Sequence, residues 1–397
     1  MKAGWTYKKL GEVVKPINGL WKGKKEPFVH VGVIRNANFT KDFTLNFDNI
    51  EYLDVEQRQY ATRKLKKGDL IVEKSGGSEK QPVGRAVLFL KDEGEFSFSN
   101  FTSVLRITDA NSLSYLFLYK YLLFVYKRGD TKKMQNAATG IHNIIWDMYL
   151  GIDVPIPSIS EQERIVAYLD TQFAKIDAMK ANAAKALAEA KALFQSALTE
   201  AMTPKEGWKM KKIGDVFRSF SGGTPLKSVD EYYKGGNIPW LRSGEVCKKY
   251  IYKTEMFITE EGMKNSSAKY YPIDTVVVAM YGATAAQVGI LKISSTSNQA
   301  VCGLLPNSDN LPEFVYYWFR FRQDFLASQA QGGAQPNISQ IKIKNLDYPI
   351  IPLPEQERIV TRLDALSAKV AALEANYTQT VAECDALKQA LLREVFE

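Results

Sequence analysis

"EQERIV" occupies residues 161–166, and the same six residues return 194 positions later at 355–360. Each copy opens a long, alanine-rich segment that contains neither proline nor glycine, and the two segments align without a gap. An internal repeat on this scale sets the domain plan of a chain. We predict an α+β protein made of two duplicated mixed α/β domains, each followed by a long α-helix. The predicted segments are a first domain (residues 1–157), a first helix (158–204), a second domain (205–353) and a second helix (354–397).

The duplication continues upstream of the helices. "GWTYKKLGEVVK" at residues 4–15 returns as "GWKMKKIGDVFR" at 207–218, and the segment 68–84 is answered by 273–289, where Val83-Gly84 matches Val288-Gly289. Between these matching stretches the two copies differ almost completely. A shared frame with different interiors predicts one architecture that holds two different recognition surfaces.

The long segments carry an apolar stripe with a period of seven residues, which is typical of a coiled coil. The stripe comprises Leu169, Ile176, Ala183, Ala190 and Ala197 in the first copy, and Leu363, Val370, Tyr377, Cys384 and Leu391 in the second. Further apolar positions widen it, among them Leu187, Phe194, Leu373 and Leu387. We predict that the helices pair as an antiparallel coiled coil with apolar surface left for helices of another protein. The alternative is two separate helices, each packed on its own domain.

The charge of the chain is concentrated in the globular parts. The net charge is +8, and residues 1–157 carry 24 lysines and arginines against 17 acidic residues. Residues 206–354 carry 17 against 13, whereas the last helical segment is acidic. A basic excess confined to two domains fits a surface for the phosphates of a nucleic acid. The alternative is that the positive charge only keeps the protein soluble.

Motifs for catalysis, metal binding or membrane insertion are missing from the sequence. The chain has no phosphate-binding G-x-x-x-x-G-K-[ST] and no G-x-G-x-x-G motif. Its three cysteines are widely spaced, and His30 and His142 are the only histidines, so we expect no metal site and no cofactor on this chain. We interpret His30, between Val29 and Val31, as a structural strand residue. The first residues lack the apolar core of a signal peptide and no apolar run has the length of a membrane span, so we expect a cytoplasmic protein without membrane contact.

Several motifs of the second unit resemble one protein family. These are "FSGGTP" (220–225), "EYYKGGNIPWLRSGEV" (231–246), Gly282, Val288-Gly289 and "PLPEQERIV" (352–360). With them the whole chain resembles the specificity (S) subunit of a type I restriction-modification system. The first unit departs from the pattern, because Asn18-Gly19 stands where Ser-Gly-Gly-Thr-Pro is expected and "FVHVGVIRN" (28–36) replaces the Ile-Pro-Trp strand.

The resemblance implies a non-catalytic, sequence-specific subunit that binds double-stranded DNA in a bacterial or archaeal cell. Each domain would read one half of a bipartite target, and the helices would set the gap and dock two methyltransferase (M) subunits. S-adenosylmethionine is then expected on the methyltransferase partner, and restriction motor-nuclease (R) subunits would join for cleavage. Two other functions stay open at this point: a non-catalytic protein scaffold with paired binding domains, and a self-sufficient enzyme with an unfamiliar active site.

The candidate DNA-contacting residues are polar side chains in loops beside predicted strands. Readout of bases in the major groove needs side chains that make paired hydrogen bonds, such as Arg or Lys to guanine and Asn or Gln to adenine. In the first domain the candidates are Lys22, Lys24, Lys25, Arg35, Asn36, Lys74, Ser75, Lys80 and Gln81. In the second domain they are Lys227, Arg242, Ser243, Lys248, Lys249, Tyr281, Asn298 and Gln299.

Overall fold

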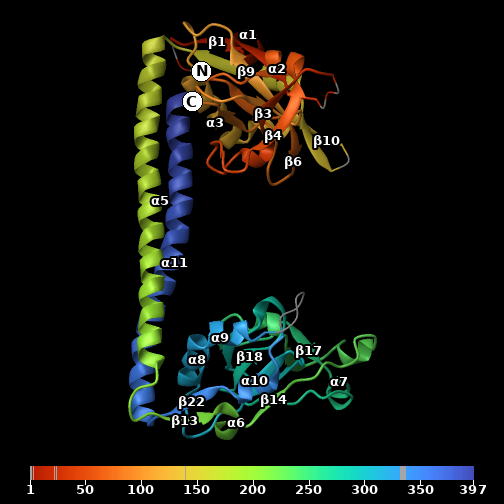
Figure 1. The fold of residues 1–397 in the computed structure, drawn as a ribbon, viewed down its shortest axis with the longest axis vertical. Helices are drawn as coiled ribbons and strands as arrows, with labels where there is room; N and C mark the ends of the chain where they lie inside the picture. Colours follow the sequence, from red (N-terminus) through yellow and green to blue (C-terminus); the bar gives the residue numbers. More distant parts are fainter. Residues whose placement is uncertain (1, 3, 22, 24, 139, 331–336) are drawn as a thin grey trace. The chain divides into compact units, whose positions relative to one another are not determined.

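The computed structural model describes residues 2, 4–21, 23, 25–138, 140–330 and 337–397, and Figure 1 traces their helices and strands. The contacts divide the chain into two compact units. Unit 1 comprises Met1–Ala183 with Tyr377–Glu397, and unit 2 comprises Ala184–Asn376. Each unit holds one globular domain that mixes helices with strands, so the α+β class predicted from the sequence is confirmed. Each unit also takes a part of both long helices.

The first domain is built on a four-stranded antiparallel sheet. Its order is β2 (Val14–Asn18), β9 (Thr102–Ile107), β5 (Leu70–Glu73) and β7 (Ala86–Leu88). Strand β5 is buried over its whole length, because Leu70 and Val72 belong to one apolar cluster and Ile71 to another. The first cluster includes helix α3 (Tyr115–Arg128). The second cluster includes a smaller sheet, with the order β4 (Glu51–Glu56), β3 (Phe28–Ile34) and β8 (Phe96–Phe98).

The second domain repeats this arrangement with different strands. Its main sheet has the order β14 (Ser219–Ser221), β21 (Val301–Leu304), β18 (Val276–Ala279), β19 (Val288–Leu291) and β16 (Tyr250–Ile251). Val276 and Val278 pack in the cluster that contains helix α8 (Pro312–Phe321), whereas Val277 packs in the cluster on the other side. A second sheet has the order β17 (Met256–Ile258), β15 (Ile238–Leu241) and β20 (Thr296–Ser297). Both domains therefore place one fully buried strand between a helix and a second layer.

A two-stranded antiparallel ribbon joins the beginning of each domain to the strand before its long helix. In unit 1, β1 (Thr6–Lys9) pairs with β12 (Asp153–Ile156), and in unit 2, β13 (Lys209–Lys212) pairs with β22 (Asp347–Ile350). The residue after the first ribbon strand makes a matching hydrogen bond in both units. The amide N of Leu10 donates to the carbonyl O of Ile152, and the amide N of Ile213 donates to the carbonyl O of Leu346. The matching sequence stretches are thus the shared structural frame.

Two long helices follow the domains. Helix α5 spans Ile159–Met202 and helix α11 spans Leu353–Phe396, with 44 residues each. At 1.5 Å per residue each helix is about 66 Å long. These bounds differ by one or two residues from the helical segments 158–204 and 354–397 expected from the repeat.

The repeated hexapeptide fixes the first turn of each helix to its own domain through a buried glutamine. The side-chain amide of Gln162, which is fully buried, donates to the carbonyl O atoms of Ser112 and Pro157, both at 2.9 Å, and accepts from the amide N of Ser114 at 2.8 Å. Gln356 does the same with Asp309, Ile351 and Leu311, at 2.9 Å each. The buried amide oxygen and nitrogen therefore tie each helix both to the loop before α3 or α8 and to the segment that leads into the helix.

In unit 1 the first part of α5 contacts the last part of α11. Lys180 pairs with Asp385 at 3.2 Å, and Asp177 pairs with Lys388 at 2.6 Å. Along this contact the residue numbers of α5 increase while those of α11 decrease. The last turn of α11 enters the core of the first domain, where Leu392, Val395 and Phe396 are buried. The ring of Phe396 lies 5.3 to 5.6 Å from the rings of three aromatic residues of α3, namely Phe117, Tyr121 and Phe124.

In unit 2 the last part of α5 contacts the first part of α11. Lys191 pairs with Glu374 at 2.6 Å, and Glu200 pairs with Arg362 at 2.8 Å. The end of α5 enters the core of the second domain, in which Leu198 and Met202 are fully buried. Each domain core is therefore completed by the end of a helix that follows the other domain in the sequence.

The predicted apolar stripe is buried most deeply near the helix ends. Leu169, Ile176 and Leu363 are buried, and Cys384 of the same stripe is buried against the backbone of Ile176. Partly exposed members of the predicted set are Leu187, Phe194, Val370, Leu373, Tyr377 and Leu391. Leu387, one of the positions that widen the stripe, is 46% exposed and is the least buried of the predicted leucines. No helix among the described residues has the length and apolarity needed to cross a membrane.

The position of Phe396 leads to a stability prediction. We expect Phe396→Ala to lower the free energy of unfolding by about 3 kcal/mol, because a buried aromatic ring is replaced by a cavity between α3 and α11. Urea unfolding of the purified chain, followed by circular dichroism, measures the change. Leu387→Ala on the same helix is the control and should cost far less, since Leu387 is exposed. Equal losses for both variants would contradict a specific anchor at Phe396.

Candidate nucleic-acid interface

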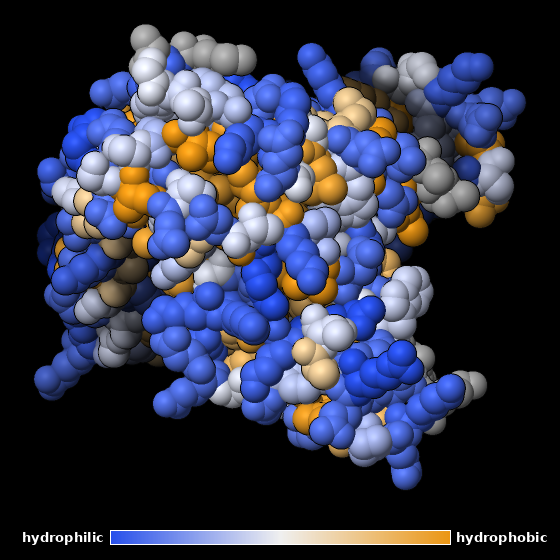
Figure 2. Space-filling view, turned by 90° about the horizontal axis from the view of Figure 1, so that it is seen from above, coloured by the Kyte–Doolittle hydropathy of each residue, from blue (hydrophilic) through white to orange (hydrophobic). Residues whose placement is uncertain are grey.

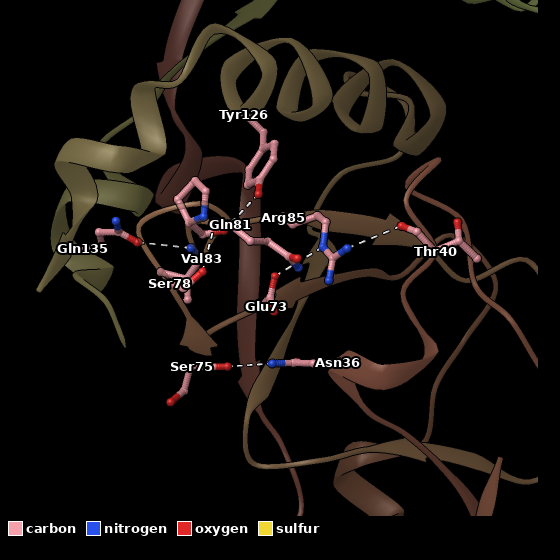
Figure 3. Close-up of polar contacts among 12 residues, drawn as sticks. Asn36, Thr40, Glu73, Ser75, Ser78, Gln81, Val83, Arg85, Tyr126 and Gln135 are labelled. Atoms are coloured by element: carbon pink, nitrogen blue, oxygen red, sulfur yellow. Dashed lines mark hydrogen bonds and ion pairs between the residues drawn. The ribbon is translucent and has the colours of Figure 1, made fainter. Parts of the chain in front are cut away.

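The loop between β5 and β7, residues 74–84, is held by side chains and backbone groups from several other parts of the first domain (Figure 3). It leaves the sheet where the amide N of Glu73 donates to Arg85 O and the amide N of Gly84 donates to Glu73 O, both at 2.9 Å. Strand β6 (Ser75–Gly77) in its first half pairs with β11 (Ile141–Ile144). At its tip, Ser78 N donates to Gln81 O at 2.8 Å and Gln81 N to Ser78 Oγ at 3.2 Å. This loop is called the β5–β7 loop below.

Side chains from four other elements hold both limbs of the β5–β7 loop. They are Asn36, whose Nδ2 donates to Ser75 O at 2.6 Å; Gln135, whose Oε1 accepts from Val83 N at 3.2 Å; Tyr126, whose hydroxyl donates to Pro82 O at 3.0 Å; and Tyr149, whose hydroxyl donates to Gly84 O at 3.1 Å. Most of these contacts are drawn in Figure 3. Because backbone carbonyls accept most of these bonds, the loop holds its shape while its tip side chains stay exposed.

The structure gathers five of the first-domain candidates on or beside this loop. Lys80 and Gln81 are exposed at the tip, whereas Lys74 and Ser75 lie half-buried in the first limb. Asn36 joins them through its bond to Ser75. Burial lowers the pKa of Lys74, whose Nζ lies 3.4 Å from Asn18 Oδ1.

Two other candidates lie apart from the loop, and two cannot be placed. Lys25 is exposed, and its amide N donates to Glu56 Oε1 at 2.9 Å. The guanidinium of Arg35 forms an ion pair with Glu51. Lys22 and Lys24 lie outside the described residues. His30 lies on strand β3 as predicted, but its ring is exposed, stacked on Tyr52 with 5.6 Å between ring centroids, and 2.8 Å from Asp54 Oδ1.

The second domain has a shorter loop at the same place, residues 280–286 between β18 and β19. The amide N of Ala286 donates to Ala279 O at 2.9 Å, as that of Gly84 does to Glu73 O in the first domain. Gly84 and Ala286 also share a positive φ, of 91° and 69°. The sequence match of Gly84 with Gly289 was therefore wrong, because the second loop is shorter and Gly84 corresponds to Ala286. This loop is called the β18–β19 loop below.

Tyr281 is the candidate that the β18–β19 loop presents. It is 37% exposed and forms a backbone bridge with Asn337. Ser75 pairs in the same way with Asn143 in the first domain. Ser75 and Tyr281 therefore occupy matching positions with different side chains.

The remaining second-domain candidates differ in how free their polar groups are. Lys227 and Lys248 are exposed, and Ser243 is partly exposed. Arg242 is held between Glu245 and Glu255. Asn298 Oδ1 accepts from Ala300 N at 3.2 Å, and Gln299 Oε1 accepts from the hydroxyl of Thr224.

Lys249 does not belong with the exposed candidates. Its ammonium forms an ion pair with Asp364 of α11, and only 18% of its side chain is exposed. The same ammonium lies 5.0 Å from the ring centroid of Tyr250 and 4.7 Å from that of Tyr317. Lys249 is therefore set apart from the exposed candidates, because its charge is used inside unit 2 to join the domain to the helix, and its contact with DNA stays a prediction.

Sequence reasoning missed Phe101 and the residues that support the β5–β7 loop. Phe101 O accepts from the amide N atoms of Lys74 and Ser75, and its side chain is 51% exposed, so an aromatic ring borders the loop. Figure 2 shows such exposed hydrophobic side chains between the hydrophilic ones that cover most of the face in view. The aromatic residue in the otherwise polar stretch "SNFTS" was a signal from which Phe101 could have been predicted as a surface residue of the site. Nothing in the sequence marks Gln135 or Tyr149 as loop supports, since both are distant in the chain.

Among the described residues, no group of three or more His, Cys, Asp or Glu side chains is arranged to hold a metal ion.

Comparison with known sequences finds the same duplicated unit. The family model described as "Type I restriction modification DNA specificity domain" matches residues 2–188 and again 205–383. The EcoR124I/EcoR124II specificity subunit of a type I restriction enzyme from Escherichia coli is 28% identical over 57% of this chain and 59% of its own length. The MjaIX specificity subunit from Methanocaldococcus jannaschii is 30% identical over 40% of this chain and 38% of its own length. The matches thus span only part of these two relatives, whereas the StySPI specificity subunit from Salmonella potsdam is 23% identical over 99% of this chain and 88% of its own length.

Solved structures share the fold over the whole chain. One, from work on the complex assembly and conformational transition of the type I R-M system, has a TM-score of 0.79 and 19% identity and covers 100% of this chain and 98% of its own. The HsdS subunit from Thermoanaerobacter tengcongensis has a TM-score of 0.58 and 19% identity, with 100% of this chain and 97% of its own covered. At this level of identity the likeness shows the fold.

The contrast between neighbouring Lys248 and Lys249 can be tested by chemical labelling. We expect a short reaction with an amine-acetylating reagent, read by mass spectrometry, to modify Lys248 faster than Lys249, because the ammonium of Lys249 is paired with Asp364. Asp364→Ala should raise the labelling rate of Lys249 and leave that of Lys248 unchanged. Equal rates for the two lysines in the unaltered chain would show that Lys249 is free, and would place it with the exposed candidates.

Proposed function

Because the chain belongs to the family of type I restriction modification DNA specificity domains, we propose that it is the DNA-reading specificity subunit of a type I restriction-modification complex. Each globular domain reads one half of a bipartite target in double-stranded DNA. The observation that carries the proposal is the duplication itself: two domains share the same ribbon, buried strand and glutamine-anchored helix, yet they differ in the β5–β7 and β18–β19 loops. Identical frames with different loops fit two separate readings.

The exposed polar residues of each domain provide the chemistry for readout. Lys80 and Gln81 at the tip of the β5–β7 loop have the donors and acceptors that base edges in the major groove require. In the second domain, Tyr281 offers a hydroxyl and a ring, and Lys248 offers a charge for phosphate. Arg35 and Arg242 are already paired with carboxylates, so their contact with DNA would require exchange of partners.

The two long helices act as the spacer between the half-sites. We propose that they pair along their length as an antiparallel coiled coil, supported by the opposite direction of the contacts within each unit. Leu169, Ile176 and Leu363 are buried members of that pairing. Exposed Leu193 and Leu387, at 62% and 46%, are left for the methyltransferase subunits to cover.

The chain itself carries no catalysis in this proposal. S-adenosylmethionine binding and adenine methylation belong to two methyltransferase subunits docked on the helices, and restriction motor-nuclease subunits join for cleavage. The complex is DNA-associated in the cytoplasm of its host. A scaffold that binds only proteins is the outcome if the assembled complex shows no sequence preference for DNA.

Separate readout by the two domains predicts a half-site exchange. Replacing residues 1–154 with the corresponding domain of a related subunit should change one half of the methylated sequence, because only one domain has been altered. Methylome sequencing of a host that carries the variant and the partner subunits measures this. The reciprocal exchange of residues 207–349 serves as the control and should alter the other half. A change in both halves from a single exchange would contradict separate readout.

The electrostatic part of binding predicts a salt dependence. Lys80→Gln should weaken binding of the assembled complex to duplex DNA and lower the slope of log K against log salt concentration by about one, because one positive charge that displaces counterions from the DNA is lost. Lys185→Gln is the matched control, since Lys185 is exposed on α5 outside both domains. Titration of a fluorescent duplex at several salt concentrations measures both slopes. An unchanged slope for Lys80→Gln would remove Lys80 from the interface.

A further inference from the structure

A buried ion pair closes the neck of the β5–β7 loop. Glu73 is the last residue of β5 and Arg85 directly precedes β7, and the amide N of Glu73 donates to Arg85 O at the point where the loop leaves the sheet. Arg85 Nε donates to Glu73 Oε2 at 3.2 Å. Only 3% of Glu73 and 7% of Arg85 are exposed. Figure 3 shows the pair between the loop and Thr40, whose carbonyl O accepts from Arg85 Nη1 at 3.4 Å. The guanidinium also lies 5.3 Å from the ring centroid of Phe39.

We expect this pair to contribute little to the stability of the sheet. Burial raises the pKa of the Glu73 carboxyl group, although Arg85 acts to lower it. The cost of removing the carboxylate from water therefore exceeds the stabilisation that Arg85 gives to its charge. Buried ion pairs in general are no more stabilising than apolar residues of similar volume, whereas the loss of one partner is costly. A pair of this kind fixes one arrangement of the groups around it.

The second domain shows that the fold does not need the pair. Ala279 and Gln287 occupy the neck of the β18–β19 loop, with the amide N of Ala279 donating to Gln287 O at 2.8 Å. Ile343 occupies the position of Tyr149. Each of the two residues lies in the short helix before the ribbon strand of its own domain, and both are buried. Where the loop is short, the polar supports are replaced by neutral or apolar side chains.

We propose that Glu73 and Arg85, together with Tyr149, are positioning residues that fix the β5–β7 loop and thereby set the selectivity of the first half-site alone. The inference rests on the proposed function for its DNA readout. Arg85 reaches Thr40 and Phe39 on one side and the loop neck on the other, and Tyr149 holds Gly84 from the α4 helix (Trp146–Leu150). The loop tip with Lys80 and Gln81 is thus oriented by groups that do not themselves touch DNA.

The test copies the neck of the second domain into the first. The variant is Glu73→Ala with Arg85→Gln, and Tyr149→Phe is a milder second variant that removes only one hydroxyl. The matched control is Asp69→Ala with Arg106→Gln, which removes another ion pair of the same sheet, at 2.7 Å, from the opposite end of β5. If the pairs served stability alone, the two double variants would behave alike.

Two measurements separate the outcomes. Hydrogen exchange of the purified full-length chain should show amides of residues 76–84 exchanging about tenfold faster in the neck variant and in Tyr149→Phe, with no such change in the control. Selection from a randomised duplex library by the assembled complex should show weaker base preference in the first half-site and an unchanged second half-site. Thermal unfolding should show that the neck variant is no less stable than the control.

Each contrary result has a distinct meaning. Unchanged loop exchange in both the neck variant and Tyr149→Phe would overturn the positioning role, whatever the chain binds. Faster exchange with both half-sites unaltered would also overturn it, because the loop would then not set selectivity. If the unaltered chain in its complex selects no sequence at all, the proposed function fails instead, and the exchange data still report on the loop.

Discussion

The buried amides of Gln162 and Gln356 are the contacts on which the rest of the molecule depends. Each makes three hydrogen bonds to backbone groups at the start of a long helix, and each is fully buried. An unsatisfied amide at such a place would be costly, so the helix can leave its domain only in the direction that completes these bonds. A fixed direction at each helix start is what the proposed spacer role of a 44-residue helix requires.

Around this shared joint the two domains differ where recognition would take place. The frame is formed by backbone pairing and apolar packing, which tolerate different loops. The β5–β7 loop is long and held by polar side chains, whereas the β18–β19 loop is short and needs few of them. One fold can therefore carry two binding surfaces that vary independently, because the residues that change are not those that hold the frame.

The sequence was sufficient for the parts of the structure that rest on repetition and periodicity. The two long helices and the mixed α+β domains followed from the repeated hexapeptide and the apolar stripe. The sequence could not separate Lys249 from the exposed candidates, because its partner Asp364 lies 115 residues away and only the folded chain brings them together. The loop match of Gly84 with Gly289 failed because a shorter loop can keep the same ladder while shifting the alignment. Gln162 gave no sign of burial, since a glutamine in a first helical turn is ordinarily solvated.

The place of Phe396 in the core of the first domain has a consequence for synthesis. Residues 392–396 supply apolar side chains to a core whose other members lie among residues 10–169. A ribosome adding about 5–20 residues per second needs some tens of seconds to advance from the first helix to these residues. During that interval the first domain presents an unfilled apolar site beside α3. Transiently exposed apolar surface of this kind favours aggregation, and the arrival of the second helix is expected to end that exposure.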